Sequence, residues 1–134
     1  MNRVLEFLQE CGVFYIATVE GDQPRVRPFG AVFEYEGKVY LTTNNTKKCY
    51  KQILQNPKVE ISGMNKGGQW IRVSGELTVD DRREVKEAAL EAVPSLKSLY
   101  SLDDGIFAVL YFTEGTAVIS SFTAATETFS LYNK

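Results

Sequence analysis

A chain of 134 residues, 44% of them hydrophobic, has room for a single core, and we expect one domain over residues 1–134. The formal net charge of −2 offers a polyanion no overall attraction, so an anion would need a local basic cluster. Histidine is absent, which excludes a Ser-His-Asp or Cys-His nucleophile and zinc or haem sites with histidine ligands, and two cysteines cannot form a four-thiolate metal site.

The cellular location follows from the cysteines and from the hydrophobic runs. Cys11 and Cys49 lie in segments that are predicted to be helical, which suits reduced thiols better than a disulfide scaffold. No run approaches the roughly 18 hydrophobic residues of a membrane-spanning helix, and the first residues lack the pattern of a signal peptide. We therefore expect a cytoplasmic protein without a membrane partner.

The first third of the chain predicts a short helix and then strands. Hydrophobic residues recur at helical spacing over 3–11. Three extended segments follow, 13–19, 25–36 and 38–43, and they are separated by Gly-containing turns. Their order predicts an antiparallel meander.

A helix interrupts the strands in the middle of the chain. It is predicted over 46–56, with Thr46 as its N-cap and Pro57 beyond its end. Strands return at 59–64 and 69–79, and a Lys-Gly-Gly turn between them predicts a second hairpin.

The last third predicts one longer helix and further strands. Helical spacing over 80–93 is followed by a shorter helical piece. Two hydrophobic segments, 106–112 and 116–122, flank Gly115 and predict a hairpin around it, and a last short strand is expected over 128–132. The whole pattern predicts a mainly β (α+β) fold, a barrel of six to seven antiparallel strands with short helices.

The turn between the strand 38–43 and the following helix is the most informative site. The strand ends in Thr42 and Thr43, and Lys47 and Lys48 open the helix. A helix N-terminus carries partial positive charge and favours acidic residues by roughly 0.3–1 kcal/mol each, so lysines there conflict with helix stability alone. Helix N–H groups, hydroxyls and ammonium groups together favour a phosphate ligand, and a phosphate monoester fits better than a dinucleotide because no glycine-rich loop is present. An ordinary helix with exposed lysines remains the alternative.

Side chains on two other strands extend this hypothesis. Arg25 and Arg27 share one face of their predicted strand, where they either add positive charge to the phosphate site or are simply solvated. Trp70 alternates with Ile71 and therefore points away from the core. A subunit interface, a second core or a stacked ligand would cover its indole ring.

Five stretches in this order resemble the pyridoxamine 5′-phosphate oxidase-related family of FMN-binding proteins. They are Arg25-Val26-Arg27-Pro28, Tyr40-Leu41-Thr42-Thr43-Asn44, Thr46-Lys47-Lys48, Gln52-Ile53 with Asn56-Pro57-Lys58-Val59, and Trp70-Ile71-Arg72-Val73-Ser74-Gly75. The resemblance covers roughly residues 10 to 80. It implies a split β-barrel homodimer with one FMN in each of two clefts between the subunits.

The resemblance also implies which residues bind the cofactor. Those that would hold the flavin phosphate and ribityl chain are Arg25, Thr42, Lys47 and Lys48, with Arg27 and Thr43 beside them. Gln69 or Trp70 would approach the flavin ring from the second subunit.

The function implied is that of an oxidoreductase in which FMN transfers electrons to or from a small molecule, without a catalytic acid or base from the chain. The size is similar to that of the nitroimidazole-reductase group. Vitamin B6 oxidases carry late Trp and Arg residues, whereas here no Arg follows Arg83, so oxidation of pyridoxamine 5′-phosphate is not expected. The alternatives are a flavin carrier or sensor without turnover and a small barrel that binds single-stranded nucleic acid, which the pI near 5.2 disfavours.

Overall fold

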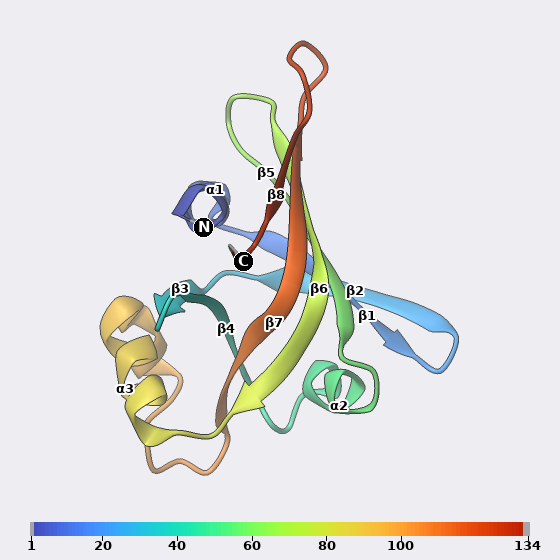
Figure 1. The fold of residues 1–134 in the computed structure, drawn as a ribbon. Helices are drawn as coiled ribbons and strands as arrows, with labels where there is room; N and C mark the ends of the chain where they lie inside the picture. Colours follow the sequence, from blue (N-terminus) through green and yellow to red (C-terminus); the bar gives the residue numbers. More distant parts are fainter. Residues whose placement is uncertain (1, 133–134) are drawn as a thin grey trace.

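The structure is a computed structural model that describes residues 2–132 of the chain. In this part of the chain, eight strands form one antiparallel sheet with three α-helices and a short 3-10 helix around it (Figure 1). The helices are α1 (Asn2–Cys11), α2 (Lys48–Gln55), α3 (Arg83–Ala92) and η1 (Pro94–Ser98). The strands are β1 (Phe14–Glu20), β2 (Gln23–Phe29), β3 (Val32–Tyr35), β4 (Lys38–Asn44), β5 (Lys58–Met64), β6 (Trp70–Asp80), β7 (Phe107–Ser120) and β8 (Glu127–Ser130). The predicted mainly β class with short helices is confirmed.

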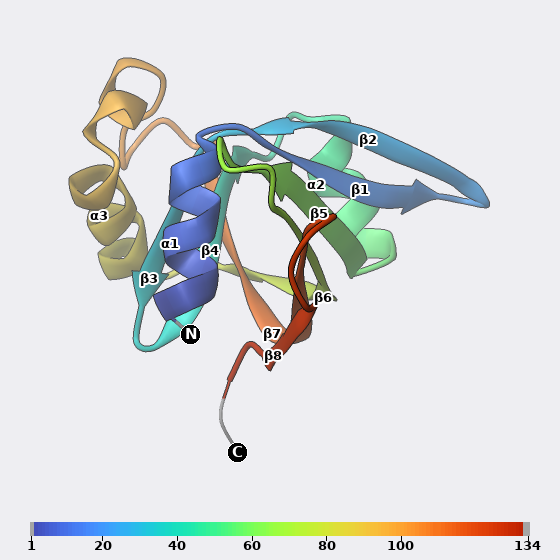
Figure 2. The ribbon, with the colours of Figure 1, turned by 90° about the horizontal axis from the view of Figure 1, so that it is seen from above.

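The sheet curls into an open barrel. Its strand order is β2-β1-β5-β6-β7-β4-β3, and β8 pairs with β7. The two ends of this order, β2 and β3, follow one another in the chain and are joined only through Gly30 and Ala31. The chain therefore connects the two edges of the sheet, and the strands surround a common interior (Figure 2).

Alternation along the strands fills the barrel with hydrophobic side chains. Every second residue of β5 is buried, and Ile61, Ile71 and Val73 have no exposed surface. Helix α1 contacts β3 and β5 and adds Phe7 and Leu8 to the same core (Figure 2). Each large side chain that is buried in this way contributes roughly 1.5–3 kcal/mol to folding.

A second, smaller core lies outside the barrel. Helix α3 packs Val85 and Ala89 against Phe33, Tyr40 and Val109, which come from β3, β4 and β7. This packing holds η1, which follows α3 directly, beside the end of β4.

A charged corner fixes the passage from β6 to α3. The hydroxyl of Tyr40 donates to Asp80 at 2.7 Å, and the Nη2 of Arg82 donates to Asp80 at 3.0 Å and to Glu36 at 2.7 Å. Burial would raise the pKa of the Asp80 carboxyl, but the bonds from Arg82 and Tyr40 outweigh it and hold this pKa below its usual value. The carboxylate thus remains charged although its side chain is buried.

The predicted meander is wrong at one point. The expected strand over 25–36 divides at Gly30 and Ala31 into β2 and β3, which lie at opposite ends of the sheet order. Both flanking turns are correct, because β1 pairs with β2 and β3 pairs with β4. The break lets the chain pass from one edge of the barrel to the other. The alternation of side chains along a segment does not predict such a change of edge.

The predicted hairpin around Gly115 is also wrong, because β7 is one continuous strand that pairs with β6 along its length (Figure 1). Gly115 lies opposite Gly75, beside a bulge between Glu76 and Leu77. A Cβ on Gly115 would lie 2.7 Å from a methyl group of Leu131. The glycine therefore permits close packing and makes no turn.

No helix among residues 2–132 is long and apolar enough to cross a membrane.

Candidate functional site

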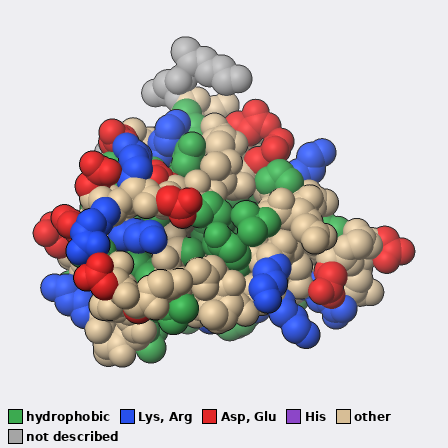
Figure 3. Space-filling view, turned by 90° about the horizontal axis from the view of Figure 1, so that it is seen from below, with side chains coloured by type: hydrophobic (Ala, Val, Ile, Leu, Met, Phe, Trp, Pro, Cys, Tyr) green, Lys and Arg blue, Asp and Glu red, His purple; other side chains and the backbone are tan. Residues whose placement is uncertain are grey.

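A cleft of about 350 Å³ lies where β2, the end of β4, the start of α2 and the segment after α3 meet. Seen from below, hydrophobic side chains gather near the middle of the molecule, and charged side chains of both signs lie around them (Figure 3). The cleft has a polar wall and an apolar wall. The polar wall contains Arg27, Thr42, Thr43 and Lys47, and the apolar wall contains Val93, Leu96, Leu99 and Tyr100.

Arg27 reaches from β2 toward α2 and is fixed by three partners. Its Nη1 donates to the Thr18 hydroxyl at 2.7 Å and to the Ile16 carbonyl at 3.2 Å, and its Nη2 donates to the Gln52 Oε1 at 2.8 Å. The Thr18 hydroxyl itself donates to the same Gln52 oxygen at 2.6 Å. A guanidinium has five N–H donors, so this arrangement orients the charge and leaves donors for a ligand.

Thr42 and Thr43 close the floor of the polar wall at the end of β4. Both residues line the cleft and are buried. Thr43 is only 4% exposed, and its hydroxyl is a buried polar atom without a hydrogen-bond partner among residues 2–132. Such a group costs roughly 1–3 kcal/mol, which a ligand oxygen in the cleft would recover.

The loop from β4 to α2 presents the start of the helix without a cap. The prediction of Thr46 as N-cap is wrong, because its N–H and hydroxyl both bond to the side-chain oxygen of Asn44. Lys47 stands at the N-cap in an extended conformation and makes no side-chain cap bond. The first-turn N–H groups of α2 therefore lack a side-chain partner and lie next to the lysine that lines the cleft.

The apolar wall comes from η1 and the residues that follow it. Leu99 is 67% exposed, although it is large and hydrophobic. The ring of Tyr100 stacks on Phe107 at 4.9 Å, and its oxygen accepts a hydrogen bond from the amide of Asn44 at 3.0 Å. A flat apolar group in this half of the cleft would contact an aromatic ring and a leucine.

Cys49 also lines the cleft, and burial raises the pKa of its thiol. The charges of Arg27 and Lys47 oppose this effect without reversing it. The thiol is therefore neutral near pH 7 and is a poor nucleophile. Cys11 is likewise a free thiol whose pKa burial raises.

Four residues that the sequence nominated do not line this cleft. Arg25 is exposed and pairs with Glu20 at 3.0 Å, and Lys48 is exposed beside Lys47. Gln69 and Trp70 lie at the β5–β6 hairpin. Gln69 and Trp70 were expected to approach the cleft of a second subunit, and the structure of a single chain does not test that prediction.

The hairpin residues have partners of their own. The Gln69 Oε1 accepts a bond from Asn65 at 3.1 Å, and the ring of Trp70 packs against Phe122 at 5.1 Å. Trp70 points away from the core, as predicted. Phe122 is 91% exposed.

Sequence reasoning missed several residues that build the cleft. Gln52 lies one helical turn after Lys48, so its face was predictable, but its bond to Arg27 was not. Tyr100 lies 56 positions after Asn44, and no local signal connects the two. Only the packing of α3 brings the apolar wall to the end of β4.

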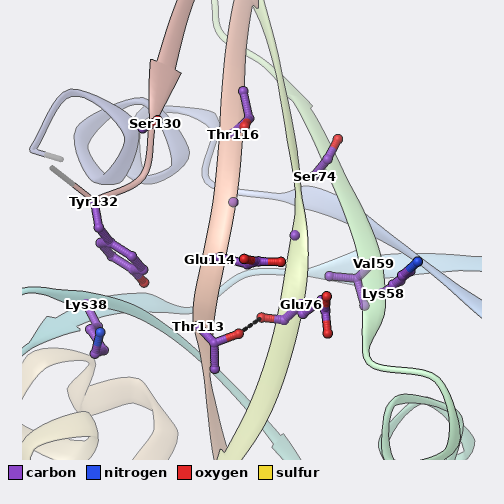
Figure 4. A pocket seen from close by; sticks show the side chains of 12 residues that line it. Lys38, Lys58, Val59, Ser74, Glu76, Thr113, Glu114, Thr116, Ser130 and Tyr132 are labelled. Carbon is purple, nitrogen blue, oxygen red and sulfur yellow. Dashed lines mark hydrogen bonds between the residues drawn. The ribbon is translucent and has the colours of Figure 1, made fainter. Parts of the chain in front are cut away.

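A larger pocket of about 610 Å³ lies along β6 and β7 (Figure 4). Its charged side chains are Lys38, Lys58, Glu76 and Glu114, whose charges cancel. It therefore lacks the net positive charge that a phosphate requires, and the cleft at α2 suits an anion better.

The sequence and the structure were compared with those of known proteins. A family described as "Pyridoxamine 5′-phosphate oxidase" matches residues 2–104. The crystal structure of a NimC/NimA family protein from Clostridium acetobutylicum is 76% identical, with a TM-score of 0.94, over 97% of this chain and 92% of that chain. No curated protein matches the chain.

Two more distant structures share the fold. A pyridoxamine 5′-phosphate oxidase-related, FMN-binding protein from Nostoc punctiforme is 14% identical, with a TM-score of 0.60, over 98% of this chain and 92% of that chain. A haem-binding protein from Mycobacterium smegmatis is also 14% identical, with a TM-score of 0.73, over 92% of this chain and 57% of that chain.

Proposed function

The chain belongs to the pyridoxamine 5′-phosphate oxidase family and has its split β-barrel fold, and on this premise we propose that it binds FMN in the cleft at α2 and works as an oxidoreductase on a small molecule. The observation that carries the proposal is the buried, unpartnered hydroxyl of Thr43 in a cleft that the cationic side chains of Arg27 and Lys47 also line. The FMN-binding relative from Nostoc punctiforme supports the choice of cofactor.

The residues of the cleft fit the two chemical halves of FMN. Arg27, Lys47 and the uncapped N–H groups of α2 supply charge and donors for a phosphate, and the Thr43 hydroxyl suits a ribityl or phosphate oxygen. Leu99 and Tyr100 offer an apolar surface for the flat ring system. The volume of about 350 Å³ lies in the range of ligand pockets.

Bound FMN would supply the electron transfer. The chain would bind and orient it and limit the access of water, because none of the residues that line the cleft is a carboxylate or an imidazole that could act as a general base. Cys49 is neutral and is not required.

We further propose a homodimer in which Gln69 and Trp70 of one subunit approach the cleft of the other. The cleft of a single chain is open on one side, with Leu99 exposed at its wall. The outward aromatic pair of Trp70 and Phe122 needs a cover. In a dimer with a two-fold axis, the aromatic pair of each subunit would cover the open side of the other subunit's cleft.

The first measurement is the visible spectrum of the purified protein, with the mass of any released chromophore. We expect FMN at about one per chain. A protein that is colourless and takes up no added FMN would overturn the proposal. Reduction by NADH or NADPH and reoxidation by candidate acceptors then separates an oxidoreductase from a flavin carrier or sensor.

The phosphate end is tested with the double variant Lys47→Ala, Lys48→Ala. We expect FMN affinity to fall at least about tenfold, because the charge-assisted bond from Lys47 to the phosphate and the neighbouring charge of Lys48 are both lost. Lys51→Ala is the matched control, since this lysine is exposed on the same helix but does not line the cleft. Equal affinities of the double variant and the wild type would refute the phosphate site.

A further inference from the structure

Asn44 organises the loop that leads into α2. Its side-chain oxygen accepts bonds from the Thr46 N–H, at 3.0 Å, and from the Thr46 hydroxyl. Its backbone carbonyl accepts a bond from the Lys47 N–H at 3.3 Å. One residue thus sets the conformation of both positions that precede the helix, where no side-chain cap does so.

Tyr100 anchors the other end of the Asn44 amide. The amide nitrogen can only donate, and it donates to the Tyr100 oxygen at 3.0 Å. The Thr46 N–H can only donate, so it faces the amide oxygen, and the bond to Tyr100 holds the amide in this orientation. Asn44 is buried and Tyr100 is half-buried, so the bond is partly shielded from water.

Tyr100 is itself held firmly. Its N–H donates to the Leu96 carbonyl at 2.8 Å, and its ring stacks on Phe107, which pairs with Asn44 in the sheet. The same ring lines the apolar wall of the cleft. Tyr100 therefore connects the apolar wall to the loop that carries Lys47.

We propose that Tyr100 and Asn44 are a pair of positioning residues that hold the Lys47 loop in its phosphate-binding conformation and so give the cleft its preference for a phosphorylated flavin. The inference rests on the proposed function. It predicts that loss of the Tyr100 hydroxyl weakens contacts to the phosphate and leaves contacts to the ring system in place. A purely structural role would weaken both equally.

The test compares FMN with riboflavin, which lacks the phosphate, on Tyr100→Phe. The variant keeps the ring and its stacking on Phe107. We expect FMN affinity to fall about five- to tenfold, as for the loss of one net hydrogen bond, and riboflavin affinity to stay within about twofold. Tyr111→Phe is the control, because Tyr111 belongs to the same apolar cluster and makes no side-chain hydrogen bond among the described residues.

A double variant tests whether the two residues act through one bond. Asn44→Ala with Tyr100→Phe should weaken FMN binding no more than Asn44→Ala alone. Additive losses would overturn the pairing. An equal loss of FMN and riboflavin in Tyr100→Phe, or no loss of FMN, would overturn the positioning role.

A readout that needs no flavin separates this inference from the proposed function. Amide hydrogen exchange at Thr46 and Lys47 should become faster in Tyr100→Phe than in the wild type and remain unchanged in Tyr111→Phe. If the wild type bound neither flavin, the proposed function would fail, together with the assigned preference. Unchanged exchange at both amides would overturn the positioning role by itself.

Discussion

Thr18 and Thr43 are both buried hydroxyl residues near the cleft, and their surroundings differ completely. The Thr18 oxygen donates to Gln52 and accepts from Arg27, so both of its roles are filled. The Thr43 oxygen has no partner. The cleft thus combines an unsatisfied hydroxyl, that of Thr43, with the positively charged side chains of Arg27 and Lys47.

This contrast predicts opposite effects of the same substitution. Thr43→Val should leave the flavin-free protein as stable or raise its free energy of unfolding by about 1 kcal/mol, because an unpaired hydroxyl is removed. The same variant should bind FMN about fivefold less tightly. Urea unfolding and FMN titration measure the two effects.

Thr18→Val provides the comparison. It breaks two bonds of a satisfied group and should lower the free energy of unfolding by about 1–3 kcal/mol. A Thr43→Val variant that is destabilised as much as Thr18→Val would show that the Thr43 hydroxyl has a partner within the protein.

At the scale of elements, the long pair of β6 and β7 forms the centre of the sheet. The two strands cross the whole molecule in Figure 1, and Gly75 and Gly115 face each other midway. A Cβ on Gly75 would collide with the backbone carbonyl of Glu114 and lie 2.9 Å from the ring of Phe112. Backbone atoms cannot move aside as a flexible side chain can, so this position requires glycine.

Gly75→Ala should therefore lower the free energy of unfolding by about 2–3 kcal/mol, the cost of overpacking a tight site. Chemical denaturation of the purified variant measures it. Gly67→Ala is the control and should be nearly neutral, since the nearest atom to its Cβ is a side-chain oxygen of Asn65 at 3.5 Å. Equal stabilities of the two variants would contradict the close approach of β6 and β7.

The whole molecule presents the cleft at α2 and the aromatic pair of Trp70 and Phe122 at opposite ends. The loops 65–69 and 121–126 project at the top of Figure 1, whereas β4 meets α2 near the bottom. Met64 lies opposite Trp70 in register and is exposed as well. A second copy in the reverse orientation would bring the aromatic end of each chain to the cleft of the other.

The double variant Trp70→Ser, Phe122→Ser should accordingly convert a dimer into monomers at micromolar concentrations, because aromatic side chains dominate interface energetics. Sedimentation velocity measures the change, and FMN affinity should fall with it. Leu54→Ser removes an exposed hydrophobic side chain from α2 and should leave the dimer intact. A wild type that sediments as a monomer would refute the dimer outright.

Features that depend on local periodicity and chemistry were predictable from the residues alone. Alternation in the segment 69–79 predicted correctly that Trp70 points outward, and helical spacing located α1, α2 and α3 within a few residues. Two threonines and two lysines around the β4–α2 turn were predicted to form one site. Thr42, Thr43 and Lys47 do line one cleft, and Lys48 does not. These inferences required only neighbours in the chain.

The tertiary structure was needed for the features that depend on how one helix or strand packs against another. Arg25 and Arg27 share a strand face, yet one pairs with exposed Glu20 and the other is held by Gln52, because only Arg27 lies over α2. Glycine is typical of turns, but Gly115 lies within a strand, where its lack of a side chain lets β6 and Leu131 approach closely. The apolar wall with Tyr100 reaches the cleft only through the packing of α3. Local periodicity reports which side of an element faces the core, whereas the partner on that side is selected by long-range packing of the whole barrel.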